Sequence, residues 1–152
     1  MIILVTSPSA LKVNGQVSQA IADVFKQVKA QNNPVGVISN HTEPAWFNEV
    51  FNQSGVRFIQ ERGRQNGEIV RWNAKKHNLD TFDALVLAST EDDLRMGKNG
   101  KAVVIVAGWS TDPRVSALGI KVESAQELKE VIDLTAAWQG DWWFSGSYAN
   151  YS

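Results

Sequence analysis

Short apolar runs alternate with amphipathic stretches from the first residue to about residue 138. Runs dominated by aliphatic residues lie at 2–5, 35–38, 56–59, 84–88 and 102–106. Strands that are apolar along their whole length are covered by helices on both faces of a parallel sheet. We therefore predict an α/β domain of three layers, with a Rossmann-like parallel sheet of about five strands. A weaker run at 119–122 predicts an additional edge strand.

The stretches between these runs carry the 3.6-residue period of amphipathic helices. Three apolar stripes define them: Val17, Ala20, Ile21, Val24 and Val28; Trp46, Phe47, Val50 and Phe51; Leu128, Val131, Ile132 and Thr135. A shorter helix is predicted over 69–79, with Ile69, Trp72 and Leu79 on its apolar side. Pro44 suits the first turn of a helix capped by Thr42, and residues 124–127 have the pattern of a capping box. We assign residues 1–138 to one α/β domain without a substantial cap insertion.

The last segment, residues 139–152, breaks the helical pattern. Its aromatic residues are separated by Gly and Ser, which favours an extended segment or a short hairpin. We expect this aromatic tail to pack on the domain and to cover exposed core. A lid, a stacking platform or a contact in a homo-oligomer is the alternative for this tail, in which the roles of Trp142 and Trp143 stay unassigned.

Charge and composition narrow the functional classes. Lys and Arg number 15, Asp and Glu number 16, and the net charge is −1, so binding driven by bulk attraction to nucleic acid is not favoured. The chain has no Cys, which excludes disulfides, thiolate metal sites and a Cys nucleophile. The opening apolar run is only four residues long, so we expect a cytoplasmic protein that does not act at a membrane. The glycine-rich signatures of dinucleotide and triphosphate sites and the serine elbow of esterases are absent from the sequence.

Polar residues directly follow several predicted strands. In open parallel sheets, ligands bind beyond the carboxyl ends of the strands, where hydroxyls and free amides hold anions. The candidate ligand-binding residues at these strand ends are Thr6, Ser7, Ser39, Asn40, Ser89 and Thr90. The same residue types are also preferred helix caps, so each of them has a local structural explanation as well.

Further candidates are basic and acidic. A basic stretch at 62–77 offers Arg64, Arg71 and Lys75 as contacts for an anion, or simply a solvated helix face. His41 follows the second strand and is a candidate for acid–base chemistry. If the loops bring them together, Asp92, Asp93 and Asp112 form a carboxylate cluster; Asp92 and Asp93 are then catalytic candidates, and Asp93 and Asp112 are metal candidates.

These strand ends resemble motifs of the haloacid dehalogenase-like (HAD) superfamily. Residues 35–40 (VGVISN) are similar to its second motif, a strand that ends in a phosphate-binding Ser or Thr. Residues 84–100 look like its fourth motif, a strand followed by an acidic loop and a short helix, and residues 102–109 are similar to the next strand. The resemblance covers residues 1 to about 135 and implies a HAD-like fold with Ser39 as a phosphate contact.

The departures from the family pattern concern the catalytic acids. The first motif of the family supplies an aspartate nucleophile and a second aspartate as general acid and base, and Thr6 and Pro8 stand at those positions. The first metal-binding aspartate of the fourth motif aligns with Ser89, and Asp93 matches the later acidic position. The basic residue of the third motif corresponds to Arg64 or Lys75. A threonine without an adjacent base is a poor nucleophile, and a proline side chain has no proton to donate.

We therefore expect a HAD-like protein without the HAD reaction. It would bind a phosphorylated small molecule, a nucleotide or a protein partner at the carboxyl edge of the sheet, and it would need no cofactor. The first alternative is an atypical phosphohydrolase that holds Mg²⁺ through Asp92, Asp93 or Asp112. The second is a structural or interaction module that uses the aromatic tail.

Overall fold

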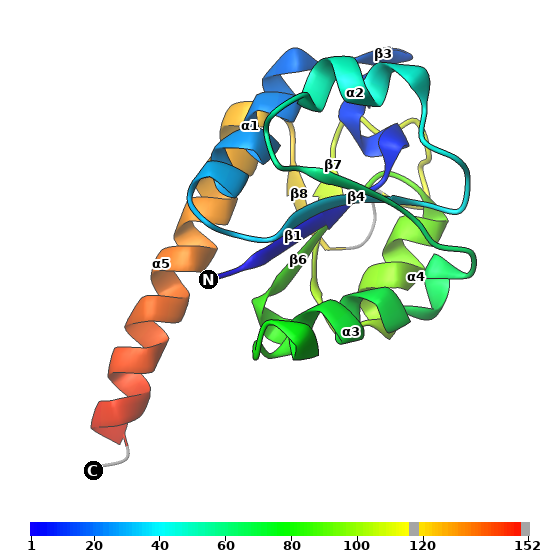
Figure 1. The fold of residues 1–152 in the computed structure, drawn as a ribbon. Helices are drawn as coiled ribbons and strands as arrows, with labels where there is room; N and C mark the ends of the chain where they lie inside the picture. Colours follow the sequence, from blue (N-terminus) through cyan, green and yellow to red (C-terminus); the bar gives the residue numbers. More distant parts are fainter. Residues whose placement is uncertain (116–118, 150–152) are drawn as a thin grey trace.

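A six-stranded sheet organises the molecule, which is a computed structural model that describes residues 1–115 and 119–149, with side chains through residue 137 (Figure 1). The strand order is β5-β4-β1-β6-β7-β8, and every neighbouring pair is parallel. The strands are β1 (Ile3–Thr6), β4 (Val35–Ser39), β5 (Arg57–Gln60), β6 (Ala84–Ala88), β7 (Val103–Ala107) and β8 (Ile120–Val122). The predicted parallel α/β architecture is confirmed, and the weak run at 119–122 supplies the edge strand β8.

Helices cover both faces of this sheet, which makes three layers. One face packs on α1 (Gln19–Ala30), α2 (Ala45–Phe51) and the first half of α5 (Ala125–Ala149). The other face packs on α3 (Glu68–Lys76) and α4 (Glu91–Asn99). The alternation of strand side chains sorts the core accordingly, since Ile2 and Leu4 join the first cluster and Ile3 and Val5 join the second.

Short elements connect these layers. The 3-10 helices are η1 (Pro8–Leu11), η2 (Arg64–Asn66) and η3 (Thr81–Asp83). An antiparallel pair, β2 (Lys12–Val13) and β3 (Gln16–Val17), follows η1 and was not expected. Its turn residues Asn14 and Gly15 both have positive φ, at 53° and 79°, as a tight hairpin turn requires. Val17 therefore belongs to this hairpin, not to the stripe of the following helix, which begins after the Ser18 cap.

Two other expectations about the helices are wrong. Trp72 is 58% exposed, because α3 buries Val70 and Ala74 instead and so presents a face rotated from the predicted one. Pro44 is itself the N-cap of α2, and no side chain caps that helix. The capping interaction of α5 is present, since the Glu127 amide donates to the Ser124 hydroxyl at 3.1 Å.

The expected extended tail is instead helical. Helix α5 continues without a break from Ala125 to Ala149, and its second half projects away from the sheet (Figure 1). Ile132 is the last buried residue along it whose side chain is described. The side chains of Trp142 and Trp143, and the whole of residues 150–152, lie outside the described part. Within that part, no helix combines the length and the apolar character that crossing a bilayer requires.

Candidate functional site

The carboxyl ends of the three central strands carry buried polar residues. Thr6 ends β1, Ser39 ends β4, and Ser89 directly follows β6, and each is at most 7% exposed. The parallel register places these three ends at one edge of the sheet. Helix η1, the 40–44 loop and helix α4 leave the sheet from this edge. The structure thus forms a polar floor where the sequence predicted a binding site.

Asp93 is the centre of a buried hydrogen-bond network at this edge. Its Oδ2 accepts from the Ser7 hydroxyl at 2.8 Å, the Ser89 amide at 2.9 Å and the Thr90 amide at 3.2 Å. The Thr90 hydroxyl in turn accepts from the Asp93 amide, which completes a capping box at the start of α4. Asp93 has no exposed surface, so its carboxyl oxygens need these donors in place of water.

Arg64 is the cation that neutralises Asp93. Its Nη1 lies 2.7 Å from Asp93 Oδ1, and the two side chains are 7% and 0% exposed. Asn40 positions the backbone of Arg64, because Asn40 Oδ1 accepts from the Gly63 and Arg64 amides. Of the two residues that align with the basic position of the third motif, the structure therefore brings Arg64 to the site and leaves Lys75 exposed on α3.

The guanidinium of Arg64 keeps unused donors. Among the described residues, only its Nη1 has hydrogen-bond partners, namely Asp93 Oδ1 and, at 4.0 Å, the Met96 sulfur. Its Nε is buried without a partner, as is Oε1 of the adjacent Gln65. An unpaired buried polar atom costs about 1–3 kcal/mol, so these two atoms leave the hydrogen bonding of this region incomplete.

The remaining strand-end hydroxyls divide into two roles. Thr6 Oγ1 donates to the Leu87 carbonyl at 2.7 Å, so its proton is used in a hydrogen bond between β1 and β6. Ser39 Oγ accepts from the His41 amide at 3.0 Å, and its own proton has no acceptor among the described residues. Ser39 is therefore a free donor at the site, and Thr6 is not.

The predicted carboxylate cluster does not form. Asp93 is paired with Arg64, and Asp112 faces Arg114, which donates to it from Nε at 3.2 Å. The side-chain hydrogen bond from Arg114 holds the pKa of Asp112 below its ordinary value. Across residues 1–115 and 119–137, no three His, Asp or Glu side chains gather as a metal site would require.

The residues present do not fit the Mg²⁺ ion that the HAD resemblance implies. Mg²⁺ takes oxygen ligands and normally needs one or two carboxylates. The one buried carboxylate here, Asp93, already accepts from a guanidinium, a hydroxyl and two amides. The neighbouring positions offer Thr6 and Ser89, whose neutral hydroxyls supply no charge.

Three other candidates lie apart from the network. Arg71 donates from Nη1 to the Asn66 and Asn99 carbonyls, so it ties the end of α4 to η2. Lys75 is exposed, and His41 is exposed with only its backbone amide engaged at the site.

Three participants were not predicted. Ser9 bridges Ser7 and Ser89 through its hydroxyl, at 3.0 and 2.9 Å. Ser110 donates to the Ser89 carbonyl, and Gln65 contributes its unpaired oxygen. The hydroxyl-rich sequences after the first and fifth strands were the available signal for the two serines, whereas no pattern marks Gln65.

The fold resembles known protein structures, although the sequence matches no known family. No family model matches the chain, and no curated protein matches it in sequence. Among solved structures, the chain is similar to the cobalt-bound deoxy-D-mannose-octulosonate 8-phosphate phosphatase of Haemophilus influenzae, with a TM-score of 0.68 and 10% identity over 89% of this chain and 88% of that one. It is similarly close to the 3-deoxy-D-manno-octulosonate 8-phosphate phosphatase of Moraxella catarrhalis, with a TM-score of 0.65 and 12% identity over 99% of this chain and 92% of that one.

A third structure extends the comparison. A phosphoglycolate phosphatase, so described for Lactobacillus delbrueckii, matches with a TM-score of 0.61 and 18% identity over 74% of this chain. The matched part is 52% of that longer protein, so this chain spans about half its length. Together with the strand order and the three layers, these similarities show that the chain shares the Rossmann-like fold of these phosphatases, as the HAD resemblance implied.

Proposed function

We propose that this chain is a non-catalytic HAD-like protein that binds the phosphate group of a small molecule or nucleotide at the carboxyl edge of the sheet. The observation that carries the proposal is the guanidinium of Arg64, which Asp93 holds in place through Nη1, while Nη2 has no hydrogen-bond partner among the described residues. A guanidinium fixed in this way offers directed donors to a phosphate oxygen. The Ser39 hydroxyl, with its free proton, adds a second donor.

The fold supports a phosphoryl ligand, and the residues at the strand ends disfavour hydrolysis. The similar structures include phosphatases, one of them in complex with magnesium, phosphate and a KDO molecule. In this chain, Thr6 donates its proton to a backbone carbonyl, and Pro8 has no titratable group. Neither position supplies the nucleophile or the general acid that a covalent phosphoryl transfer needs.

The proposal is tested by titrating the ¹⁵N-labelled protein with inorganic phosphate and with phosphomonoesters. We expect shifts of the backbone amides around Ser39, Asn40 and Arg64. Ser39→Ala should weaken binding, and the double variant Arg64→Met with Asp93→Asn should abolish it while removing both buried charges together. Ser54→Ala is the matched control, because it removes a hydroxyl that serves a loop away from this edge.

Hydrolysis is measured on the same samples. We expect no turnover of phosphate esters with Mg²⁺ above that of the Asp93→Asn variant. Turnover that Asp93→Asn abolishes would overturn the non-catalytic proposal and support the atypical phosphohydrolase. Unchanged binding in the double variant would show that Arg64 is not the phosphate contact.

A second candidate function rests on the shape of α5. Its second half projects from the domain and carries the aromatic residues of the sequence tail (Figure 1). A projecting helix of this kind is suited to contact a second copy or a protein partner. Truncation after Gln139 with light scattering tests this: a change of oligomeric state with an intact fold supports an interaction role, and an unchanged state refutes self-association through this helix.

A further inference from the structure

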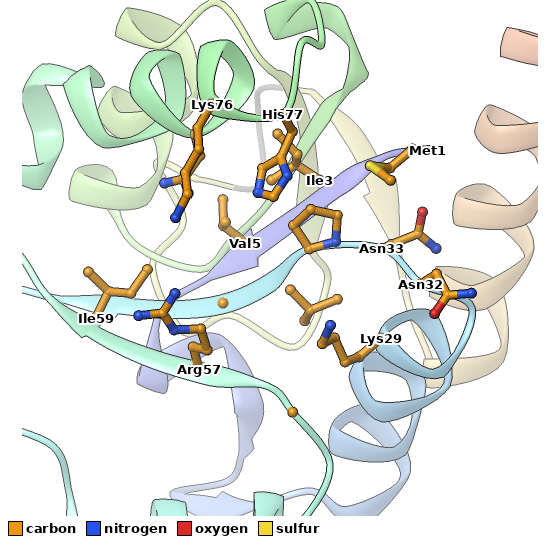
Figure 2. Close-up of a pocket in the computed structure, with 15 residues that line it drawn as sticks. Met1, Ile3, Val5, Lys29, Asn32, Asn33, Arg57, Ile59, Lys76 and His77 are labelled. Atoms are coloured by element: carbon orange, nitrogen blue, oxygen red, sulfur yellow. The ribbon is translucent and has the colours of Figure 1, made fainter.

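A separate cavity lies at the opposite edge of the sheet. Its volume is about 280 Å³, and its walls come from the amino-terminal ends of β1, β4 and β5 and from the carboxyl-terminal ends of α1 and α3. Figure 2 shows Arg57 reaching into it from β5, and Lys76 and His77 from α3, above the side chain of Val5. No residue of the Asp93 network lines this cavity.

Gly36 makes the space. Val5, Gly36 and Arg57 are register partners on three adjacent strands, so they form one row across the sheet on the face that carries α3. The middle position of this row has no side chain, and the edge strand β5 leaves Ile59 half-buried beside it. A glycine within a buried strand often marks a close approach by a ligand or another chain segment.

The cavity is lined by basic residues without matching acidic ones. Lys29, Arg57, Lys76 and His77 line it, and none of the described lining residues is Asp or Glu. None of these four residues forms an ion pair with a described residue. Lys76 makes a cation–π contact, in which its Nζ lies 5.1 Å from the centroid of the Trp72 ring.

Helix ends explain only part of this charge. Lys29 and Lys76 lie in the last turns of α1 and α3, where cations offset the helix dipole, and His77 directly follows α3. Arg57 begins a strand, is exposed, and has no such local reason. Its guanidinium nevertheless points into the same cavity (Figure 2).

Part of the remaining lining is apolar, and one of its polar residues is held in place by hydrogen bonds. Ile3, Val5 and Ile59 provide an aliphatic floor. Asn33 is fixed at both ends of its amide, because Oδ1 accepts from the Ile2 amide and Nδ2 donates to the Val28 carbonyl, each at 3.0 Å. A preformed pocket with an apolar floor and converging charged groups is typical of small-molecule sites.

We infer that this cavity binds a small organic anion, a phosphate or carboxylate carried on a flat apolar body about the size of a mononucleotide. The apolar body would lie on Val5 and Ile59 in the space over Gly36. The anionic group would lie between Arg57 and Lys76, where a guanidinium and an ammonium supply charged donors from two sides. This site is independent of the phosphate site proposed at the other edge of the sheet.

The test uses two anionic probes, adenosine monophosphate and 2-naphthoate, followed by ¹⁵N NMR on the full chain. We expect either or both to shift the amides of Gly36 and Arg57 with a Kd below about 1 mM. Adenosine, which lacks the charge, and inorganic phosphate, which lacks the apolar body, should bind at least about tenfold more weakly at these amides. Absence of shifts at Gly36 and Arg57 with both probes would overturn the inference.

Gly36→Val is the decisive variant, because its side chain would occupy the space over β4 where the apolar body of the ligand would lie. A Cβ at this position would lie 3.5 Å from Ile59 Cδ1 and 3.7 Å from the Arg57 carbonyl oxygen, which are ordinary contacts, and valine favours strands. We expect an unchanged or higher melting temperature together with loss of probe binding. Probe binding that survives Gly36→Val would also overturn the inference.

Two further variants assign the charge and separate the two sites. Arg57→Gln should weaken anion binding, whereas Arg62→Gln, an equal change of charge at an exposed residue outside the cavity, should not. Ser39→Ala should leave binding at Gly36 unchanged, although it weakens phosphate binding at the other edge. An equal effect of Arg57→Gln and Arg62→Gln would show nonspecific attraction and refute the cavity as the site.

Discussion

The buried pair of Arg64 and Asp93 allows a double-mutant cycle with an asymmetric outcome. Both side chains are at least 93% buried, so removing one partner leaves the other charge in the interior without its counterion. Breaking a buried pair in this way costs about 3–5 kcal/mol. For a domain of this size, that corresponds to a fall in melting temperature of about 6–20 °C.

The two single variants should differ from each other. Arg64→Met leaves Asp93 with the donors from Ser7, Ser89 and Thr90, so we expect it to lie at the lower end of that range. Asp93→Asn leaves the buried guanidinium without a counterion, with only a neutral amide oxygen and the Met96 sulfur as acceptors, and it weakens the cap of α4, so we expect the larger loss.

The double variant Arg64→Met with Asp93→Asn removes both charges and should be more stable than the sum of the single losses predicts, by at least about 1–2 kcal/mol. Urea unfolding followed by circular dichroism gives all four free energies. Asp23→Asn is the control, since its partner Lys26 is 3.7 Å away at the surface and the loss should stay within about 1 kcal/mol. Additive losses across the cycle, or an Asp93→Asn variant as stable as the control, would refute the role assigned to this pair.

Three further outcomes follow from single positions. Gly67→Ala should lower the free energy of unfolding, measured with a chemical denaturant, by more than about 3 kcal/mol. The reason is that φ is +75° at this position and that a Cβ would lie 2.2 Å from the Gly100 backbone nitrogen. A soluble variant with wild-type stability would contradict this. Thr6→Val should lower the free energy of unfolding by about 1–2 kcal/mol, because the hydrogen bond to the Leu87 carbonyl of β6 is lost. Phosphate binding should stay unchanged, and loss of binding would show that Thr6 contacts the ligand. In an NMR titration, the Asp112 carboxyl should show a pKa below its ordinary value of 3.8. Its contribution to stability is therefore present above pH 3.8 and is lost as the pH falls through the lower folded pKa. Arg114→Gln should return the pKa of Asp112 to the ordinary range, and an unchanged pKa in that variant would refute the assignment to Arg114.

The strands were predictable because the signal for them is local. The run at 84–88 is apolar at every position, and a strand buried on both faces requires that composition. The hairpin at 12–17 was missed although Asn14 and Gly15 carry a strong turn signal, because Val17 also continues the period of the next helix. Trp72 was misplaced for a related reason, since a nine-residue helix with a low apolar content leaves its inward face poorly defined by sequence alone.

The candidate site was predictable only as a set of strand ends. Sequence order shows which residues follow β1, β4 and β6, and the parallel arrangement then collects Ser7, Ser39 and Ser89 at one edge. The pairing of Arg64 with Asp93 spans 29 residues and depends on how η2 packs on α4, which no local pattern encodes. The cavity at the other edge was not predicted, although a glycine amid the β-branched residues of 35–38 was its one visible sign.

The hydrogen bond from Thr6 to the β6 carbonyl also limits what engineering can do with this scaffold. An aspartate introduced at position 6 alone would direct a carboxylate at a carbonyl oxygen, in a place with no exposed surface. The carbonyl oxygen would repel this buried carboxylate, and the folded protein would be destabilised. A route from this chain to a working phosphatase therefore needs several concerted substitutions, and we expect Thr6→Asp alone to destabilise the protein instead of giving a weak catalyst.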